Sequence, residues 1–184
     1  AAMRDYIIMT DSCCDLSQQE VEELDLTVLP LSFTIEGKTL LNTPDHADLS
    51  PEEFFKKIAE GADCTTSAVN VGQFTDAMEK VLDEGKDILC ICFSSALSTT
   101  YQSACIAASD LREKHPGAKI IVIDSLSASR GQGMLLYRTV RERREKGLDI
   151  DALASYVDSI IQSQDHWFFV DDLNHLKRGG RVSA

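Results

Sequence analysis

Short apolar runs alternate with longer amphipathic stretches along most of the chain. Three of the runs are typical of buried strands, namely DYIIMT (5–10), DILCICF (87–93) and KIIVID (119–124). Amphipathic segments with apolar residues at helical spacing separate and follow these runs. Chains in which strands and helices alternate form right-handed βαβ crossovers. We therefore predict an α/β fold with a mainly parallel sheet and helices on both of its faces.

Local signals indicate where several elements begin and end. Ser17, followed three residues later by Glu20, predicts a capping box at the start of one helix, and Asn70 is a typical N-cap for another. Gly147 predicts the end of a long helix, because glycine commonly follows the last helical turn. Period-two apolar residues over 26–42 predict β structure of an edge-like kind.

The pattern divides the sequence into two unequal parts. Residues 1–150 carry the alternating strands and helices and form the predicted N-terminal α/β domain. A helix over DIDALASYVDSIIQSQ and a strand HWFFVD come next. Residues 151–184 are therefore the predicted beginning of a second α/β domain.

Composition argues against several classes of protein. The formal net charge of -12 would repel a phosphate backbone, so nucleic acid is not an expected partner. The sequence has neither a long apolar span nor the pattern of a signal peptide, so we expect a cytoplasmic protein. The six cysteines lack the paired CxxC spacing of zinc sites, which predicts reduced thiols and no metal.

Hydroxyl side chains are concentrated where the predicted strands end. In an open α/β sheet, ligands bind beyond the carboxyl ends of the strands, next to the free amides of helix N-termini. Short hydroxyls and free amides suit a small anion such as a carboxylate, because both donate hydrogen bonds. They suit a nucleotide less well, since the sequence has no GxxxxGK[ST] loop. The segments are TDSCCD (10–15), TTS (65–67), FSSALS (93–98), IDSLSAS (123–129) and VDDLNHLKRGG (170–180).

Several roles are compatible with such serines. A serine hydrolase acting on acyl esters needs a nucleophile elbow, usually GxSxG, followed by an acid and a histidine. FSSALS carries no glycine, which weighs against this function. A binding protein, for instance a sensor of a small carboxylate, needs only the hydrogen-bond donors. Each serine could also simply cap a helix or shape a turn.

Five motifs of the chain together resemble those of a known family. TDSCCDL, TTSAVN, FSSALSTTYQSA, VIDSLSASRGQG and FFVDDLNHLKRGGRVS resemble, in order and spacing, the motifs of the DegV family. The members of this family are the fatty-acid-binding subunits of bacterial fatty acid kinase. The resemblance spans essentially the whole chain, and five motifs in the right order are far more specific than any one of them alone.

The resemblance implies a protein that encloses one long-chain fatty acid. The acyl tail would lie in an apolar tunnel between two α/β domains, with the carboxylate held by hydroxyls. In the family a separate ATP-dependent kinase subunit phosphorylates the bound carboxylate, and the lipid-binding subunit carries the acyl phosphate to phospholipid synthesis. The expected partners are thus the fatty acid, the kinase subunit and, transiently, a membrane or an acyltransferase. The chain itself is expected to be a carrier without catalytic residues, metal or a cofactor other than the bound lipid.

Motif matching assigns residues to this site. The resemblance implies that Thr66 and either Ser94 or Ser95 donate hydrogen bonds to the carboxylate, with Ser67 and Ser98 close by. Further residues expected at the pocket are Asp11, Ser12 and Ser125, and those expected to contact the kinase subunit or the new phosphate are Lys177, Arg178 and Arg181.

The sequence departs from the family's pattern in two loops and in its length. Ala96 and Thr99 stand where the serine loop of the family usually has glycine, and TTSAVN carries Ala68 and Val69 where Gln and Pro are usual. The family's chains continue well beyond GGRVS, whereas this sequence stops at Ala184. We therefore expect the chain to be truncated within its second domain, with part of the tunnel wall outside it.

Overall fold

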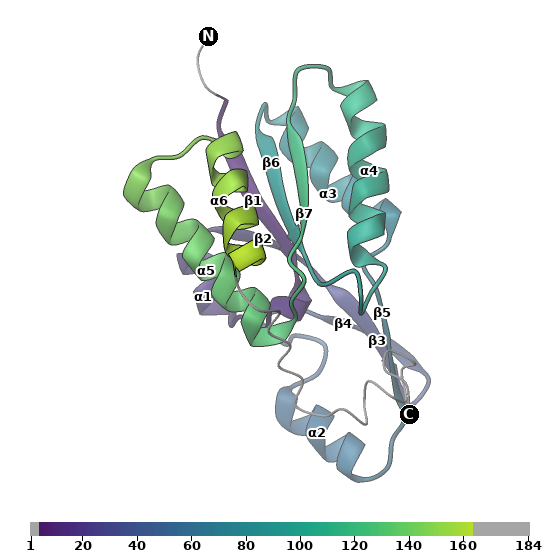
Figure 1. The fold of residues 1–184 in the computed structure, drawn as a ribbon. Helices are drawn as coiled ribbons and strands as arrows, with labels where there is room; N and C mark the ends of the chain where they lie inside the picture. The colour runs from purple at the N-terminus through teal and green to yellow at the C-terminus, as the bar shows by residue number, and fades with distance from the viewer. Residues whose placement is uncertain (1–3, 164–184) are drawn as a thin grey trace.

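A parallel sheet forms the centre of the computed structural model, which describes residues 4–163 (Figure 1). In the order in which they pair, its four strands are β2 (Leu26–Leu29), β1 (Tyr6–Asp11), β6 (Asp87–Cys92) and β7 (Ile120–Asp124), and every pair is parallel. In register, Asp11 lies opposite Leu29, and Cys92 lies opposite Asp124. The carboxyl ends of the strands therefore meet along one edge of the sheet.

Helices cover both faces of this sheet, which confirms the predicted α/β fold (Figure 1). One face carries α3 (Val71–Asp83) and α4 (Thr100–Lys114). The other face carries α1 (Gln18–Glu23), α5 (Ser129–Lys146) and α6 (Ile150–Ser163).

Alternate side chains of the strands supply the two cores between these layers. Ile8 and Leu89 belong to the core shared with α5 and α6, whereas their neighbours Met9 and Cys90 belong to the core shared with α3 and α4. This alternation is the period of two that an extended strand imposes. Strands buried on both faces have no polar side, which explains why they are continuous apolar runs in the sequence.

The predicted helix ends are confirmed. Ser17 Oγ accepts a hydrogen bond from the Glu20 amide at 3.1 Å, and Glu20 Oε1 accepts one from the Ser17 amide at 3.2 Å. Asn70 makes the same reciprocal pair with Gln73, at 2.8 and 3.0 Å. Gly147 follows α5 in the left-handed conformation, with φ of 59°.

A second, antiparallel sheet lies beyond the carboxyl edge of the first (Figure 1). It consists of β4 (Lys38–Asn42), β3 (Leu31–Ile35) and β5 (Cys64–Ser67) in that order, and α2 (Pro51–Ala59) lies between β4 and β5 in the chain. The β structure predicted for 26–42 is therefore confirmed. β5 was not predicted, because TTS was expected only to lead into a helix; instead Thr66 pairs with Phe33 of β3.

The helix after the expected domain boundary packs with the residues before it. Leu153 and Val157 of α6 are fully buried in the same core as Leu89 of β6 and Leu136 of α5. The boundary at residue 150 stays a prediction. The predicted strand HWFFVD and the rest of 164–184 lie outside the described residues.

All six cysteines are free thiols. Within residues 4–163, no three His, Cys, Asp or Glu side chains gather as metal ligands would. Over the same residues, no helix is long and apolar enough to cross a membrane.

Candidate ligand-binding site

The candidate site begins where β1 and β6 end. A single 3₁₀ turn, η1 (Ser12–Cys14), follows β1, and Asp11 caps it by accepting a hydrogen bond from the Cys13 amide at 3.1 Å. The other carboxylate oxygen of Asp11 accepts a hydrogen bond from the Phe93 amide at 2.7 Å. Gln132 of α5 donates to Asp11 from its side chain at 3.2 Å. One carboxylate therefore joins the ends of two strands and the start of a helix.

A cavity of ≈ 430 Å³ lies between this edge and the antiparallel sheet. Most of its lining is apolar and aromatic. Phe54 of α2 packs edge to face against Phe33 of β3, with ring centroids 5.7 Å apart. Phe55 packs in the same manner against Phe54. The larger apolar residues of the lining are Leu31, Phe33, Leu49, Phe54, Phe55, Phe93 and Leu97.

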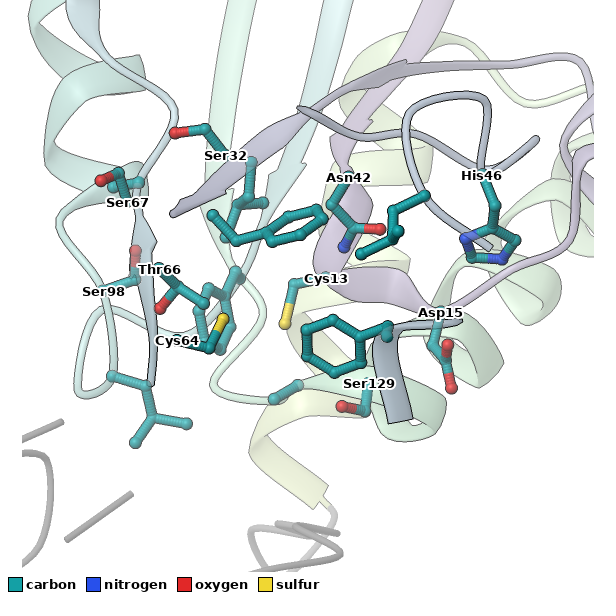
Figure 2. Close-up of a pocket in the computed structure, with 18 of the residues that line it drawn as sticks. Cys13, Asp15, Ser32, Asn42, His46, Cys64, Thr66, Ser67, Ser98 and Ser129 are labelled. Carbon is teal, nitrogen blue, oxygen red and sulfur yellow. The ribbon is translucent and has the colours of Figure 1, made fainter. Parts of the chain in front are cut away.

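Polar side chains lie at several places on this wall, and two groups of them stand on opposite sides in Figure 2. On one side are Thr66 and Ser67 of β5, with Ser98 of the loop after β6. On the other side are His46 and Asp15. The cavity thus offers a group of neutral hydroxyls next to an apolar wall, which is the pairing that an amphipathic ligand requires.

Ser98 is held in place by the first residue of α4. Its Oγ accepts a hydrogen bond from the Thr100 amide at 3.2 Å and lies 2.8 Å from the Thr100 hydroxyl oxygen. When the Thr100 hydroxyl donates this second bond, the proton of Ser98 is directed to another acceptor. An anion in the cavity would be such an acceptor.

The two serines earlier in this loop have different partners. Ser94 is fully buried, and its Oγ accepts a hydrogen bond from the Ala96 amide at 3.3 Å. Ser95 donates from its hydroxyl to the carboxylate of Asp124, which also accepts the Ser95 amide at 3.2 Å. Both serines lie outside the lining of the cavity. A hydrolase triad places an imidazole between the serine and the acid, whereas here the serine contacts the acid directly.

The remaining predicted pocket residues support the cavity from outside its lining. Ser12 Oγ accepts a hydrogen bond from the Leu31 amide at 2.9 Å, which ties η1 to β3. Ser125 exchanges two hydrogen bonds of 3.2 Å with the backbone of Ser127 in the turn between β7 and α5. The predicted basic residues Lys177, Arg178 and Arg181 lie outside the described residues.

Burial controls the charge of Asp11 and of Cys13 at this edge. Desolvation raises the pKa of Asp11 to about 6, although hydrogen bonds from Phe93, Gln132 and Cys13 act in the opposite direction. Desolvation also raises the pKa of Cys13 to about 12. The Cys13 thiol in the cavity wall is therefore neutral and a poor nucleophile near neutral pH.

The serine-rich motifs do not reveal the aromatic part of the wall. Phe33, Phe54 and Phe55 come from β3 and α2, which lie outside those motifs. One signal for them is present in the sequence: SPEEFFKKIAEG predicts a short helix with two adjacent phenylalanines on a charged background. The apolar side of such a helix needs a surface to pack against, and here it faces the cavity, where Phe54 contacts Phe33.

The fold and the cavity together define an α/β domain built around a space for a small molecule, next to the carboxyl edge of its sheet. A family model described as "Uncharacterised protein, DegV family" matches residues 6–184. The chain belongs to the DegV family, which confirms the resemblance found in its motifs.

Relatives and solved structures agree with this assignment. The chain is 40% identical over 182 residues to a DegV domain-containing protein of Clostridium perfringens, a match that covers 99% of the chain and 62% of that relative. It is similar to a fatty-acid-binding DegV family protein from Thermus thermophilus, with 31% identity and a TM-score of 0.79 over 96% of this chain and 60% of that one. It is also similar to a stearic acid-binding protein from Eubacterium ventriosum, with 30% identity and a TM-score of 0.75 over 83% and 52%. The chain thus spans less than two thirds of the length of these proteins.

Proposed function

We propose that this chain forms part of a carrier for a long-chain fatty acid. The acyl chain would lie along the apolar wall of the cavity, and the carboxylate would accept hydrogen bonds from Thr66 and Ser98, with Ser67 close by. The observation that carries the proposal is the cavity itself, in which an aromatic wall adjoins a group of neutral hydroxyls (Figure 2). The fatty acids bound by the Thermus and Eubacterium proteins support the same class of ligand.

The tail of such a ligand would supply most of the binding free energy. Burying an acyl chain of about sixteen carbons contributes on the order of 10 kcal/mol, at about 0.8 kcal/mol for each methylene. The volume of ≈ 430 Å³ lies within the roughly 300–1,000 Å³ of small-molecule pockets. The head group therefore needs only to be oriented.

Hydroxyls are suited to that task. A neutral donor binds a carboxylate without the desolvation penalty of burying a cationic partner. In a medium of low dielectric constant each of these hydrogen bonds is stronger than it would be in water. Ser94 and Ser95 would then act indirectly, because their contacts shape the loop that presents Ser98.

The proposal extends to partners. A carrier without catalytic groups requires a second protein to activate the carboxylate, and we assign this role to an ATP-dependent kinase subunit that forms an acyl phosphate. Lys177, Arg178 and Arg181 are its proposed contacts, because a guanidinium pairs with phosphate in two-point geometry. Delivery of the product to phospholipid synthesis would bring transient contact with a membrane or an acyltransferase in the cytoplasm.

Extraction of the purified protein with organic solvent, followed by mass spectrometry, tests the ligand. We expect one fatty acid for each protein molecule, and we expect the delipidated protein to bind palmitate more tightly than hexadecanol, which lacks the carboxylate. Phe54→Ala should weaken palmitate binding. Phe74→Ala is the control, because Phe74 lies on the buried face of α3 and its loss lowers stability without changing the lining of the cavity. Delipidated protein that binds no acid from myristic to stearic would contradict the proposal.

The kinase contact is tested separately. Arg178→Ala and Arg181→Ala should reduce phosphorylation of the bound acid by the kinase subunit and leave the affinity for palmitate unchanged. An equal loss of phosphorylation and of binding would show instead that these arginines support the fold or the ligand.

A further inference from the structure

Asp11 holds three separate pieces of the cavity wall with one buried carboxylate. Its side chain is inaccessible to solvent and accepts hydrogen bonds from the Cys13 amide, the Phe93 amide and the Gln132 side chain, at 3.1, 2.7 and 3.2 Å. Cys13 and Phe93 both line the cavity. Gln132 lies in the first turn of α5, whose first residue, Ser129, also lines it. The positions of all three pieces therefore depend on one acceptor.

Gln132 has an unusual environment in this arrangement. It is fully buried, and its Nε2 donates both to Asp11 and, at 3.0 Å, to the hydroxyl of Thr10. Its Oε1 is buried without a hydrogen-bond partner among the described residues. A buried acceptor left unpaired costs free energy, so native proteins rarely retain one. Turning the amide over would bring Oε1 towards Asp11, which can donate to it only when the carboxyl is protonated.

We propose that Asp11 is a positioning residue for the ligand cavity and that Asp11 and Gln132 form a pH-sensitive switch. In the ionised state, Asp11 holds the Cys13 and Phe93 amides in the wall that receives the ligand. In the protonated state, Gln132 turns over to accept the new proton, and the hold on the two amides weakens. The inference rests on the proposed function, because the quantity that it concerns is the affinity of the cavity for a lipid.

The expected direction follows from the hydrogen bonds. Those accepted by an ionised carboxylate are roughly twice as strong as those accepted by a neutral group. Desolvation raises the pKa of Asp11 to about 6, so the change of state falls at mildly acidic pH. The affinity should therefore fall as the pH falls through this value.

The thiols around Asp11 do not change state in the same range. Burial raises the pKa of Cys13 and of Cys14 to about 12. A hydrogen bond with Cys90, together with burial, raises the pKa of Cys92 well above its usual value. These thiols stay neutral in acid, and the donors to Asp11 are themselves neutral groups. The facing titratable groups are Cys13, Cys14 and Asp15 beside η1, Cys92 at the end of β6 and Asp124 at the end of β7.

The test measures affinity against pH with a ligand whose head group does not titrate. Hexadecanesulfonate stays anionic throughout, so a change in its dissociation constant reports on the protein. For the wild-type protein we expect this constant to rise about tenfold from neutral pH to about pH 5, the effect of weakening hydrogen bonds to a charged group. Asp11→Asn should bind weakly at every pH, with a flat profile. Asp87→Asn is the matched control, because Asp87 is a buried aspartate at the opposite edge of the sheet and should leave the wild-type profile unchanged.

Gln132→Met gives a second, independent result should Asp11→Asn not fold. It removes a hydrogen bond that lowers the pKa of Asp11, so the midpoint of the affinity profile should move to higher pH. The inference is overturned if the affinity of the wild-type protein for hexadecanesulfonate does not change with pH, or if Asp11→Asn shows the same pH dependence as the wild type. It is also overturned if the midpoint of the pH dependence does not move in Gln132→Met. If the wild-type protein binds neither hexadecanesulfonate nor palmitate at neutral pH, the proposed function fails and the inference fails with it.

Discussion

The hydroxyl of Ser95 donates a hydrogen bond to the carboxylate of Asp124, and the Ser95 amide donates to the same carboxylate at 3.2 Å. The Leu126 amide also donates to Asp124, at 3.1 Å. The loop after β6 is thereby fastened to the loop after β7. A hydroxyl has one proton to donate, and that of Ser95 is directed to Asp124. Ser98, three residues later, lines the cavity instead.

This difference predicts that substitutions of Ser98 and of Ser95 affect different properties, the affinity in one case and the stability in the other. Ser98→Ala should weaken fatty acid binding roughly tenfold to a hundredfold, the effect of losing one hydrogen bond to a charged group. Ser95→Ala should lower the free energy of unfolding by about 1–3 kcal/mol and change the affinity much less. Calorimetric titration and chemical denaturation of both variants measure the two quantities. Equal losses of affinity would contradict the division of roles.

A close approach of α5 to η1 makes Gly133 sensitive to the smallest substitution. A Cβ atom at this position would lie 2.7 Å from the Cys14 carbonyl oxygen and 3.1 Å from Leu16 Cδ2. Gly133→Ala should therefore push the helix from η1 and destabilise the protein by about 1–3 kcal/mol. Because Cys13 of η1 lines the cavity, lipid affinity should fall as well.

Gly72, in the first turn of α3, is the control for this substitution. Its Cβ would meet only Asn70 Oδ1, at an ordinary 3.4 Å. Gly72→Ala should therefore be neutral or stabilise the helix by up to about 1 kcal/mol. Thermal denaturation compares the variants, and similar melting temperatures would contradict the packing argument.

Burial of Asp11 predicts a pH dependence of stability opposite in sign to that of the proposed binding. The pKa of Asp11 is raised from 3.8 to about 6, so between these values the folded state binds more protons than the unfolded state. The contribution of this group to the free energy of unfolding falls as the pH rises through this window and is constant above it. A shift of about two units corresponds to about 3 kcal/mol.

Denaturation of the wild-type protein and of Asp11→Asn at a series of pH values isolates this contribution. The asparagine cannot ionise, so the stability of the variant relative to the wild type should increase by about 3 kcal/mol between about pH 3.5 and pH 7. A difference that does not vary with pH would mean that Asp11 titrates at its ordinary pKa.

Two arginines of α5 that lie over tyrosine rings predict unequal effects. Arg143 lies 3.8 Å from the ring centroid of the buried Tyr6 and donates to its carbonyl oxygen at 2.8 Å. Arg141 lies 6.0 Å from the ring centroid of the exposed Tyr137. Arg143→Met should cost about 1–2 kcal/mol of stability, and Arg141→Met less than about 0.5 kcal/mol. Urea denaturation of the two variants measures the difference, and equal losses would contradict the dependence on burial.

Elements specified by neighbouring residues could be predicted from the sequence. The capping boxes of Ser17 and Asn70 each join residues three apart, and the buried strands appear as continuous apolar runs. β5 escaped prediction because its structure is set by pairing with β3, some thirty residues earlier in the chain. The residues next to β5 in the sequence do not indicate which distant strand it pairs with.

The candidate site also has a part that the sequence predicted and a part that it did not. The motifs that contain Thr66, Ser67 and Ser98 lead to the hydroxyl side of the cavity, since those residues do line it. They do not separate Ser98 from Ser95, because the partner of Ser95 is Asp124, on another strand. They also miss Phe33 and Phe54, whose contact forms only when α2 folds back over β3.

α2 lies outside both cores of the parallel sheet. None of its nine residues is buried, and Phe55, which lines the cavity, remains 68% exposed. Its contacts include the ring pair of Phe54 with Phe33 and an exposed ion pair between Lys57 and Glu36, of a kind that contributes little to stability. A lipid in the cavity would cover these rings as a neighbouring side chain does in an ordinary protein interior. On the proposed function, the lipid would then act as part of the folded structure, and the order of this helix would report whether the cavity is occupied.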